Sequence, residues 1–135
     1  MAQKETQKKQ TIRIECINPI LNVKDLSRSR NYYVNVLGFK EADWGKDKTF
    51  TCMQRDNTGI YLCQDGQGQA GTWVWIGFDG DMAFLYEDFS AKGATIRRPP
   101  TNFSWALEMC IEDPDGHVLR FGTDPLEDHP YADNV

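Results

Sequence analysis

The sequence has 135 residues, of which 40% are hydrophobic, which suffices for one domain or for two small halves around a shared core. Its net charge is −5, and because residues 1–10 carry +2, the rest of the chain carries −7. This balance argues against nucleic acid or an anionic membrane as the main partner and favours a cationic or neutral small ligand. No run of about 18 apolar residues, the length that crosses a bilayer, occurs.

The cysteines indicate the redox environment of the protein. Cys16, Cys52, Cys63 and Cys110 stand far apart and form no Cys-x-x-Cys pair. This spacing, together with the lack of a recognisable signal peptide, is typical of reduced thiols rather than of disulfides. We therefore expect a cytoplasmic protein.

The first half of the chain predicts a strand, a helix and three further strands. Residues 1–10 are polar and without periodicity, and we expect them to be a disordered tail. Residues 12–23 alternate as a strand does, and Pro19, which has no amide donor, favours an edge position or a bulge. Asp25 should cap a helix that ends at Gly38. The buried face of this helix should be Leu26, Ser29, Tyr33 and Leu37, and the strands after it residues 39–44, 49–55 and 59–64.

The second half repeats this order. It should contain a glycine-rich connector (65–71), a strand (73–78), a helix capped by Asp81 that runs to Ala91, a strand (94–98), a loop at Pro99-Pro100 and a closing hairpin (105–122). Residues 113–116, Asp-Pro-Asp-Gly, form the turn of this hairpin. Leu119 and Phe121 share one face of the last strand, so Arg120 lies on the opposite face.

The spacing of matching features indicates an internal duplication. Val23 and Phe78 are 55 residues apart, and so are Gly38 and Gly93. We interpret the chain as an α+β protein with one module at residues 11–64 and a second at 72–124, joined by the connector. Residues 125–135 are expected to be a frayed end.

Two stretches resemble a known family. Residues 21–39, which read LNVKDLSRSRNYYVNVLGF, resemble the opening of the vicinal oxygen chelate superfamily, which contains glyoxalases, bleomycin-resistance proteins and dioxygenases. The Asp-Pro-Asp-Gly turn and the strand after it resemble its closing hairpin, so the resemblance covers roughly residues 12–124. It implies two βαβββ modules that form a curled mixed sheet with a concave, ligand-binding cleft.

Many members of this superfamily hold a divalent metal through His and Glu side chains in the cleft. By the resemblance, the ligand positions fall on Asn18, Trp73, Arg120 and either Tyr61 or Cys63. None of these is a good oxygen or imidazole ligand, and Arg120 repels a dication. We therefore expect no metal and no cofactor, and a protein that is not an enzyme.

The remaining features resemble the bleomycin-resistance branch, at residues 18–21, 60–63, 72–76 and 105–108. This resemblance implies binding and sequestration of an antibiotic-type, bleomycin-like small molecule by a homodimer whose clefts lie between subunits. The ligand is expected to be planar, aromatic and cationic or zwitterionic. It should stack on aromatic rings, and acidic residues should balance its positive charge. The residues expected at the ligand are Asn18, Trp44, Phe50, Tyr61, Cys63, Trp73, Trp75, Phe103, Trp105, Glu108 and Arg120.

Several of these residues also have a purely structural interpretation. Trp73 and Trp75 are alternatively the cover of a half-buried strand, and Cys63 a small buried hydrophobe. Glu108 is alternatively a solvated charge on the sheet, and Arg120 the partner of a carboxylate across the sheet. Two other functions stay open: a superfamily lyase, isomerase or dioxygenase with an atypical metal site, and a protein-interaction module whose cleft its own side chains fill.

Overall fold

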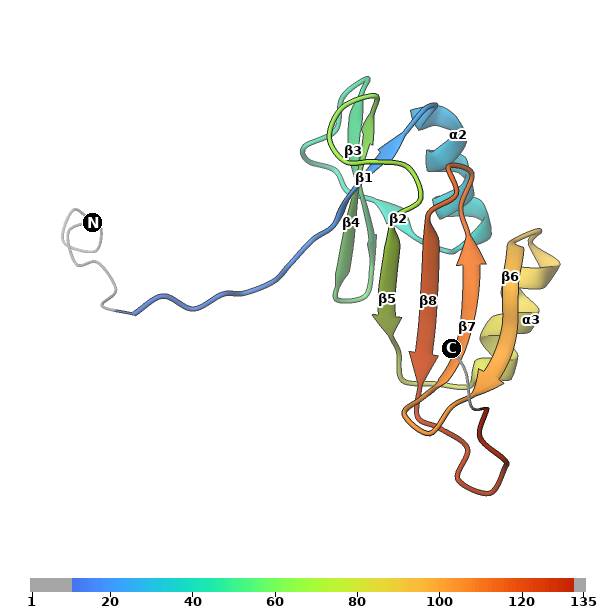
Figure 1. The fold of residues 1–135 in the computed structure, drawn as a ribbon. Coiled ribbons are helices and arrows are strands. Elements are labelled where there is room, and N and C mark those ends of the chain that lie inside the picture. The colour runs from blue at the N-terminus through green and yellow to red at the C-terminus, as the bar shows by residue number, and fades with distance from the viewer. Residues whose placement is uncertain (1–10, 133–135) are drawn as a thin grey trace.

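The computed structural model describes residues 11–132, which form two four-stranded sheets, each with its own helical segment (Figure 1). The strand order is β1-β4-β3-β2 in the first sheet and β5-β8-β7-β6 in the second. In each sheet the outer first strand pairs in parallel with the last, and the other pairs are antiparallel. The predicted α+β architecture of two βαβββ modules is therefore confirmed, although the two sheets do not close into one. The predicted tail at residues 1–10 lies outside the described residues.

The elements follow the same order in both modules. The first contains β1 (Ile20–Val23), α2 (Leu26–Asn31), the π-helical turn η1 (Tyr32–Val36), β2 (Lys40–Glu41), β3 (Phe50–Arg55) and β4 (Thr58–Gln64). The second contains β5 (Trp73–Gly77), α3 (Met82–Ala91), β6 (Thr95–Asn102), β7 (Leu107–Glu112) and β8 (Val118–Thr123). The predicted caps are correct, because the side chain of Asp25 accepts from Arg28 N and that of Asp81 from Ala83 N.

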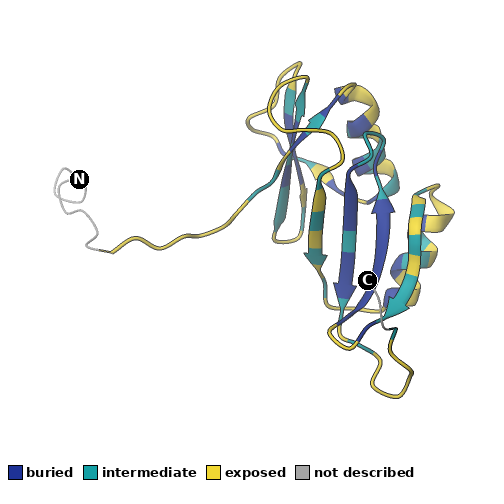
Figure 2. Ribbon diagram, viewed as in Figure 1, coloured by how far each residue is buried: buried dark blue, intermediate teal, exposed yellow. Residues whose placement is uncertain are grey.

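The first strand is much shorter than the predicted residues 12–23. β1 pairs in parallel with β4 from the position where Ile20 lies opposite Tyr61, and the amide of Tyr61 donates to Pro19 O. β4 begins only at Thr58, so residues before about 17 have no neighbouring strand to pair with. The chain before residue 17 instead runs as an extended segment that leads away from the sheets (Figures 1 and 2), with Ile12 and Ile14 exposed, whereas Asn18 and Pro19 still bond to β4.

Three other predicted boundaries also change. The helix predicted from Asp25 to Gly38 is α-helical only to Asn31 and continues as η1. The strand predicted at residues 39–44 is reduced to Lys40–Glu41, which leaves Trp44 in the following loop. The loop predicted at Pro99-Pro100 is wrong, because both prolines lie inside β6. This strand is at the sheet edge, and its pairing with β7 shifts register between Ile96 and Thr101, an arrangement that tolerates residues without an amide donor.

One face of each sheet packs against its helix and forms the core. The predicted helix face is correct, since Leu26, Ser29, Tyr33 and Leu37 are all buried. In the second module, Met82, Leu85 and Phe89 of α3 cover apolar side chains that include Met109, Ile111, Leu119 and Phe121. β7 and β8 are buried along nearly their whole length, whereas β5 has exposed positions (Figure 2). The second faces of β7 and β8 are therefore covered by something other than the helix.

The turn of the β7–β8 hairpin joins the two modules. The buried hydroxyl of Tyr33 donates to Asp113 Oδ2 at 2.8 Å. His117 is fully buried, and its Nδ1 accepts from Thr72 N at 2.9 Å while its Nε2 lies 2.6 Å from Asn22 O. Because Nδ1 accepts an amide hydrogen, the proton of the neutral ring is on Nε2, which donates to the carbonyl. His117 thus links the start of the second module to β1.

Candidate functional site

The strand register gathers polar and aromatic side chains on the face of the second sheet that lies away from α3. Arg120 of β8 lies between Trp75 of β5 and Cys110 of β7. Glu108 lies two residues away from Cys110 along β7, opposite Gly122. Residues paired across strands point to the same face, so the register alone places these side chains together.

Glu108 is the centre of this face. Its Oε2 accepts from the indole nitrogens of Trp75 at 2.8 Å and Trp105 at 3.2 Å, and its Oε1 accepts from Arg120 Nη2. Glu108 is buried, so the interpretation of this residue as a solvated sheet charge is wrong. Arg120 pairs with a carboxylate across the sheet, as its structural interpretation predicted.

The contacts of Glu108 keep it ionised. Burial by itself raises the pKa of the Glu108 carboxyl, but the hydrogen bonds from Arg120 and Trp75 and the positive charge of Arg120 outweigh it. The pKa of Glu108 therefore lies below its ordinary value. A buried carboxylate with donors on both oxygens is a fixed anchor for the groups that contact it.

The aromatic rings of this face have defined positions. The indole of Trp75 lies over the backbone of two glycines, because a Cβ built on Gly77 or Gly122 falls 2.7 Å from an indole carbon. Phe103 and Trp105 stack with their centroids 4.6 Å apart and their planes 4° apart. Trp73, Trp75 and Trp105 are each about half exposed, so these rings offer surface to a ligand as well as covering the strands.

A pocket of about 220 Å³ opens between these side chains. Its lining residues are Trp73, Arg97, Arg98, Phe103, Glu108, Cys110 and Arg120. Two arginines of β6 lie on its aromatic walls: the guanidinium of Arg97 is 5.1 Å from the ring centroid of Trp73, and that of Arg98 is 4.9 Å from that of Phe103. The pocket thus combines flat aromatic walls with charged groups.

The expected residues of the first module form a separate group on the corresponding face of its sheet. Tyr61 is its centre, with the ring of Trp44 at 6.3 Å and that of Phe50 at 5.4 Å. Cys63 lies opposite Phe50 on the same face. The structure therefore distributes the predicted residues over two groups, and the 220 Å³ pocket is lined by the second module alone.

Asn18 lies at the junction of the modules. Its side-chain nitrogen donates to Gly59 O at 2.9 Å. Asn18 and Trp75 both line a further pocket of about 190 Å³, between residues 16–19 and 57–60 of the first module and 74–77 of the second.

The positions that correspond to the superfamily's metal ligands do not suit a divalent cation. Trp73 provides no ligand atom, and the one ligand atom of the Asn18 side chain, its neutral amide oxygen, accepts from Cys16 Sγ at 3.4 Å. Arg120 places a positive charge next to Glu108, the carboxylate nearest to it on this face. Among residues 11–132, no three His, Cys, Asp or Glu side chains lie close enough together to hold a metal ion.

Sequence reasoning missed Arg97, Arg98 and Cys110. Alternation along β7 places Cys110 on the same face as Glu108, so the sequence pattern could have predicted that Cys110 lies at the site. The two arginines precede Pro99-Pro100, which the sequence predicts to be a loop, and the register shifts of β6 prevent the alternation pattern from showing which face they lie on.

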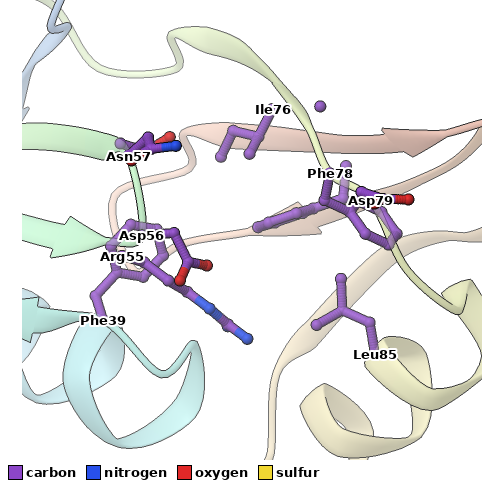
Figure 3. Close-up of a pocket in the computed structure, with 11 residues that line it drawn as sticks. Phe39, Arg55, Asp56, Asn57, Ile76, Phe78, Asp79 and Leu85 are labelled. Atoms are coloured by element: carbon purple, nitrogen blue, oxygen red, sulfur yellow. The ribbon is translucent and has the colours of Figure 1, made fainter.

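Another pocket, of about 410 Å³, lies on the helix-covered side of the second sheet (Figure 3). It lies between Phe39 and Arg55 of the first module and Ile76, Phe78 and Leu85 of the second. Nη1 of Arg55 donates to Leu37 O at 2.6 Å. None of the predicted site residues lines this pocket, whose walls combine the core side chains of Phe39, Leu85 and Phe121 with polar residues at 55–58 and 79. We therefore take the pocket around Glu108 as the candidate site.

No helix within residues 11–132 is long and apolar enough to cross a membrane. No curated protein matches the sequence. Several solved structures share the fold. TnmS3, an antibiotic binding protein from Streptomyces sp. CB03234, is 17% identical, with a TM-score of 0.71 over 86% of this chain and 100% of that one. TioX from Micromonospora sp. ML1 is 18% identical, with a TM-score of 0.70 over 83% of this chain and 99% of that one.

An integron cassette protein from V. cholerae, VCH_CASS1, is 20% identical, with a TM-score of 0.69 over 84% of this chain and 98% of that one. At such identities these likenesses establish the fold. The model of the Glyoxalase/Bleomycin resistance protein/Dioxygenase superfamily matches residues 13–121. The chain belongs to that superfamily.

Proposed function

We propose that this protein binds and sequesters a planar aromatic small molecule without transforming it. The observation that carries this proposal is the pocket around Glu108 on the outer face of the second sheet, which Trp73 and Phe103 line and next to which Trp105 stacks on Phe103. Beside this pocket, the rings of Trp75 and Trp105 are half exposed and are fixed by hydrogen bonds to Glu108, which suits stacking with a flat ligand. Capture of this kind lowers the free concentration of the compound and needs no reactive group.

The superfamily and its structural relatives support an antibiotic-type ligand. One of the similar structures is described as an antibiotic binding protein, and the superfamily includes bleomycin-resistance proteins. Bleomycin-type glycopeptides, which are bulky and contain planar heterocycles, are therefore the first compounds to test. The net charge of −7 outside residues 1–10 attracts cations at long range, and a zwitterion satisfies both this field and the arginines of the pocket.

We further propose that the protein acts as a homodimer. The aromatic group around Tyr61 and the pocket around Glu108 belong to different modules of one chain, and β1 and β5 are edge strands of sheets that do not join. An edge strand is a template for pairing with another chain. A twofold dimer that places the Tyr61 face of one copy over the Glu108 pocket of the other completes the cleft. Sedimentation should give a mass of twice 15.5 kDa at micromolar concentration, and a monomer contradicts the dimer.

The state of the cysteines supports a reducing compartment. Cys16, Cys52, Cys63 and Cys110 are all free thiols. We propose that the protein acts in the cytoplasm, where thiols stay reduced.

Equilibrium dialysis and tryptophan fluorescence with a panel of planar aromatic antibiotics, bleomycin included, test the proposed function. We expect saturable binding of at least one compound, quenching of fluorescence, and recovery of the compound unchanged after long incubation. Recovery separates this function from its rival. If the panel does not bind while small carbonyl compounds are turned over, the protein is a superfamily enzyme. If no compound binds and a protein partner is captured at this face, the interaction module replaces both.

A further inference from the structure

We propose that the pocket of about 410 Å³ on the helix-covered side of the second sheet is a second ligand site, which takes a protonated amine carried on an aromatic or hydrocarbon body. This inference goes beyond the proposed function and does not rest on it, because this pocket shares no lining residue with the pocket around Glu108. The two pockets lie on opposite faces of the same strands, since Ile76 and Phe121 line the one, and Arg120, next to Phe121, lines the other.

The size and the walls of this pocket suit a small organic body. Its volume lies within the roughly 300–1,000 Å³ that is usual for ligand pockets. Its apolar lining comes from both modules and consists of Phe39, Ile76, Phe78, Leu85 and Phe121. Phe39, Leu85 and Phe121 are buried, whereas Ile76 and Phe78 are partly exposed. An apolar ligand body would therefore cover side chains that water now reaches.

The charged residues that line the pocket are negative on balance. Asp56, in the turn between β3 and β4, and Asp79, which follows β5, contribute two carboxylates, and Arg55 contributes one guanidinium. Asp56 and Arg55 lie on the side of the first module and Asp79 on that of the second (Figure 3). Among residues 11–132, no hydrogen bond or ion pair engages either carboxylate. Both can therefore accept a cationic group of a ligand.

Arg55 does not neutralise these carboxylates. Its Nη1 donates to Leu37 O at 2.6 Å. A Cβ built on Gly38 would lie 3.1 Å from the same nitrogen, so the guanidinium packs closely against the backbone of residues 37–38. Two carboxylates against one guanidinium leave the pocket with one net negative charge. An ammonium group beside Asp56 or Asp79 is therefore favoured over a neutral group of the same size.

The aromatic walls favour the same kind of ligand. Phe39, Phe78 and Phe121 present three phenyl rings to the pocket. The face of an aromatic ring attracts an ammonium group that comes within about 6 Å, and it also stacks with an aryl body. The net charge of −7 outside residues 1–10 attracts cations from a distance. The walls, the carboxylates and the overall field thus all select a cation with an apolar body.

Isothermal titration calorimetry with two probes of the same shape tests the inference. The probes are 2-naphthylmethylammonium and 2-naphthylmethanol, which present one ring system with a positive and a neutral group. We expect the ammonium compound to bind at least about fivefold more tightly than the alcohol, which is the scale of an exposed ion pair. Equal affinities, tighter binding of the alcohol, or no binding of either compound overturns the inference.

Charge variants locate the preference in this pocket. Asp56→Asn and Asp79→Asn should each weaken binding of the ammonium compound by about two- to fivefold, and the double variant should remove its advantage over the alcohol. Asp65→Asn is the matched control, because Asp65 has the same φ of 52° as Asp56 and does not line the pocket. Asparagine readily adopts this left-handed conformation, so the turns keep their shape. An advantage that persists in the double variant, or that Asp65→Asn removes equally, overturns the assignment to this pocket.

A wall variant separates the apolar contribution from the charge. Phe78→Ala should weaken binding of both probes by about threefold or more, because it removes a partly exposed ring without changing any charge. Near-ultraviolet circular dichroism of each variant checks the fold, and the charge variants decide the matter if Phe78→Ala disturbs it. Unchanged affinity of a folded Phe78→Ala for both probes places the ring system elsewhere and overturns the inference. The antibiotic panel around Glu108 is a separate measurement, so either proposal can fail without the other.

Discussion

The two sheets both present aromatic side chains on the face away from their helices, but they hold them by different means. On the first sheet, Tyr61 contacts Trp44 and Phe50 through their rings. On the second sheet, Trp75 and Trp105 each donate a hydrogen bond to Glu108, which Arg120 neutralises. Ring contacts fix distance loosely, whereas a hydrogen bond also fixes direction.

The two modules have the same strand order, but the different side chains on their outer faces suit them to different roles in ligand binding. Among strand residues of the first face, the charge is confined to Lys40 of the edge strand β2, whereas the central strands β7 and β8 place Glu108 and Arg120 on the second face. We infer that the second module selects the ligand and that the first provides apolar cover. The duplicated strand order keeps the shape of the two halves alike, and substitutions on one face distinguish their chemistry.

The largest expected effect comes from removing the charge of Glu108. Glu108→Gln should lower the free energy of unfolding by about 2–3 kcal/mol, because it leaves Arg120 without its carboxylate in a mostly buried site. Tyr61→Phe, at the centre of the first face, should change it by less than about 0.5 kcal/mol. Urea unfolding followed by circular dichroism measures both. Similar losses in the two variants would show that the two faces do not differ in this way.

Ligand binding should show the same asymmetry. Trp105→Ala removes the ring that stacks on Phe103 and should weaken binding of a planar aromatic compound by about 1–3 kcal/mol. Trp44→Ala, which removes a similarly exposed ring from the first module, should weaken it by about 1 kcal/mol or less. Calorimetric titration of both variants compares them, and an equal or larger loss for Trp44→Ala contradicts selection by the second module.

At acidic pH, the difference in unfolding free energy between the wild type and Glu108→Gln should become smaller. The pKa of Glu108 is lower in the folded protein than its ordinary value, so its carboxylate stabilises the fold at pH values above the unfolded pKa of about 4.3. This stabilisation is lost as the pH falls through the folded pKa. The gap in unfolding free energy between the two proteins should therefore narrow from about pH 7 to about pH 3. A gap that is constant over this range means that the charge of Glu108 is not its cause.

The smallest expected effect is that of metal removal. Because Trp73, Arg120 and the neutral amide of Asn18 make a poor ligand set, chelator treatment should change neither the melting temperature nor ligand binding. Elemental analysis should find less than stoichiometric Zn, Ni, Mn or Fe. About one such ion per chain, lost in Asn18→Ala, would show that the fold has kept a metal site by other means.

The modular fold was predictable because its signals are local. Asp25 and Asp81 cap their helices, and alternation marks the central strands, whatever surrounds them. The errors arise where a strand depends on its partner. Residues 12–19 alternate like a strand, but β4 begins too late to pair with most of them, and Pro99-Pro100 looks like a loop until the edge position of β6 is known.

The candidate site was predictable only in part for the same reason. Periodicity shows that Glu108 and Arg120 can share a face, but it does not show that Glu108 also receives two indoles. Those contacts depend on the register of β5 against β8 and on side-chain conformations set by packing. The separation of the Tyr61 group from the Glu108 pocket depends on how the modules are joined, which no local pattern contains.

The position of the Trp75 indole depends on the two glycines that it packs against, Gly77 and Gly122. Neither Gly77 nor Gly122 has a positive φ, so their backbone accepts alanine, yet a methyl group at either position would meet the indole at 2.7 Å. A single methyl group can therefore tilt the indole away from Glu108 and change the 190 Å³ pocket that Trp75 lines, without changing the identity of any other side chain. Substitutions at these two glycines therefore offer evolution, or an engineer, a way to change which compounds bind without replacing the side chains that contact them.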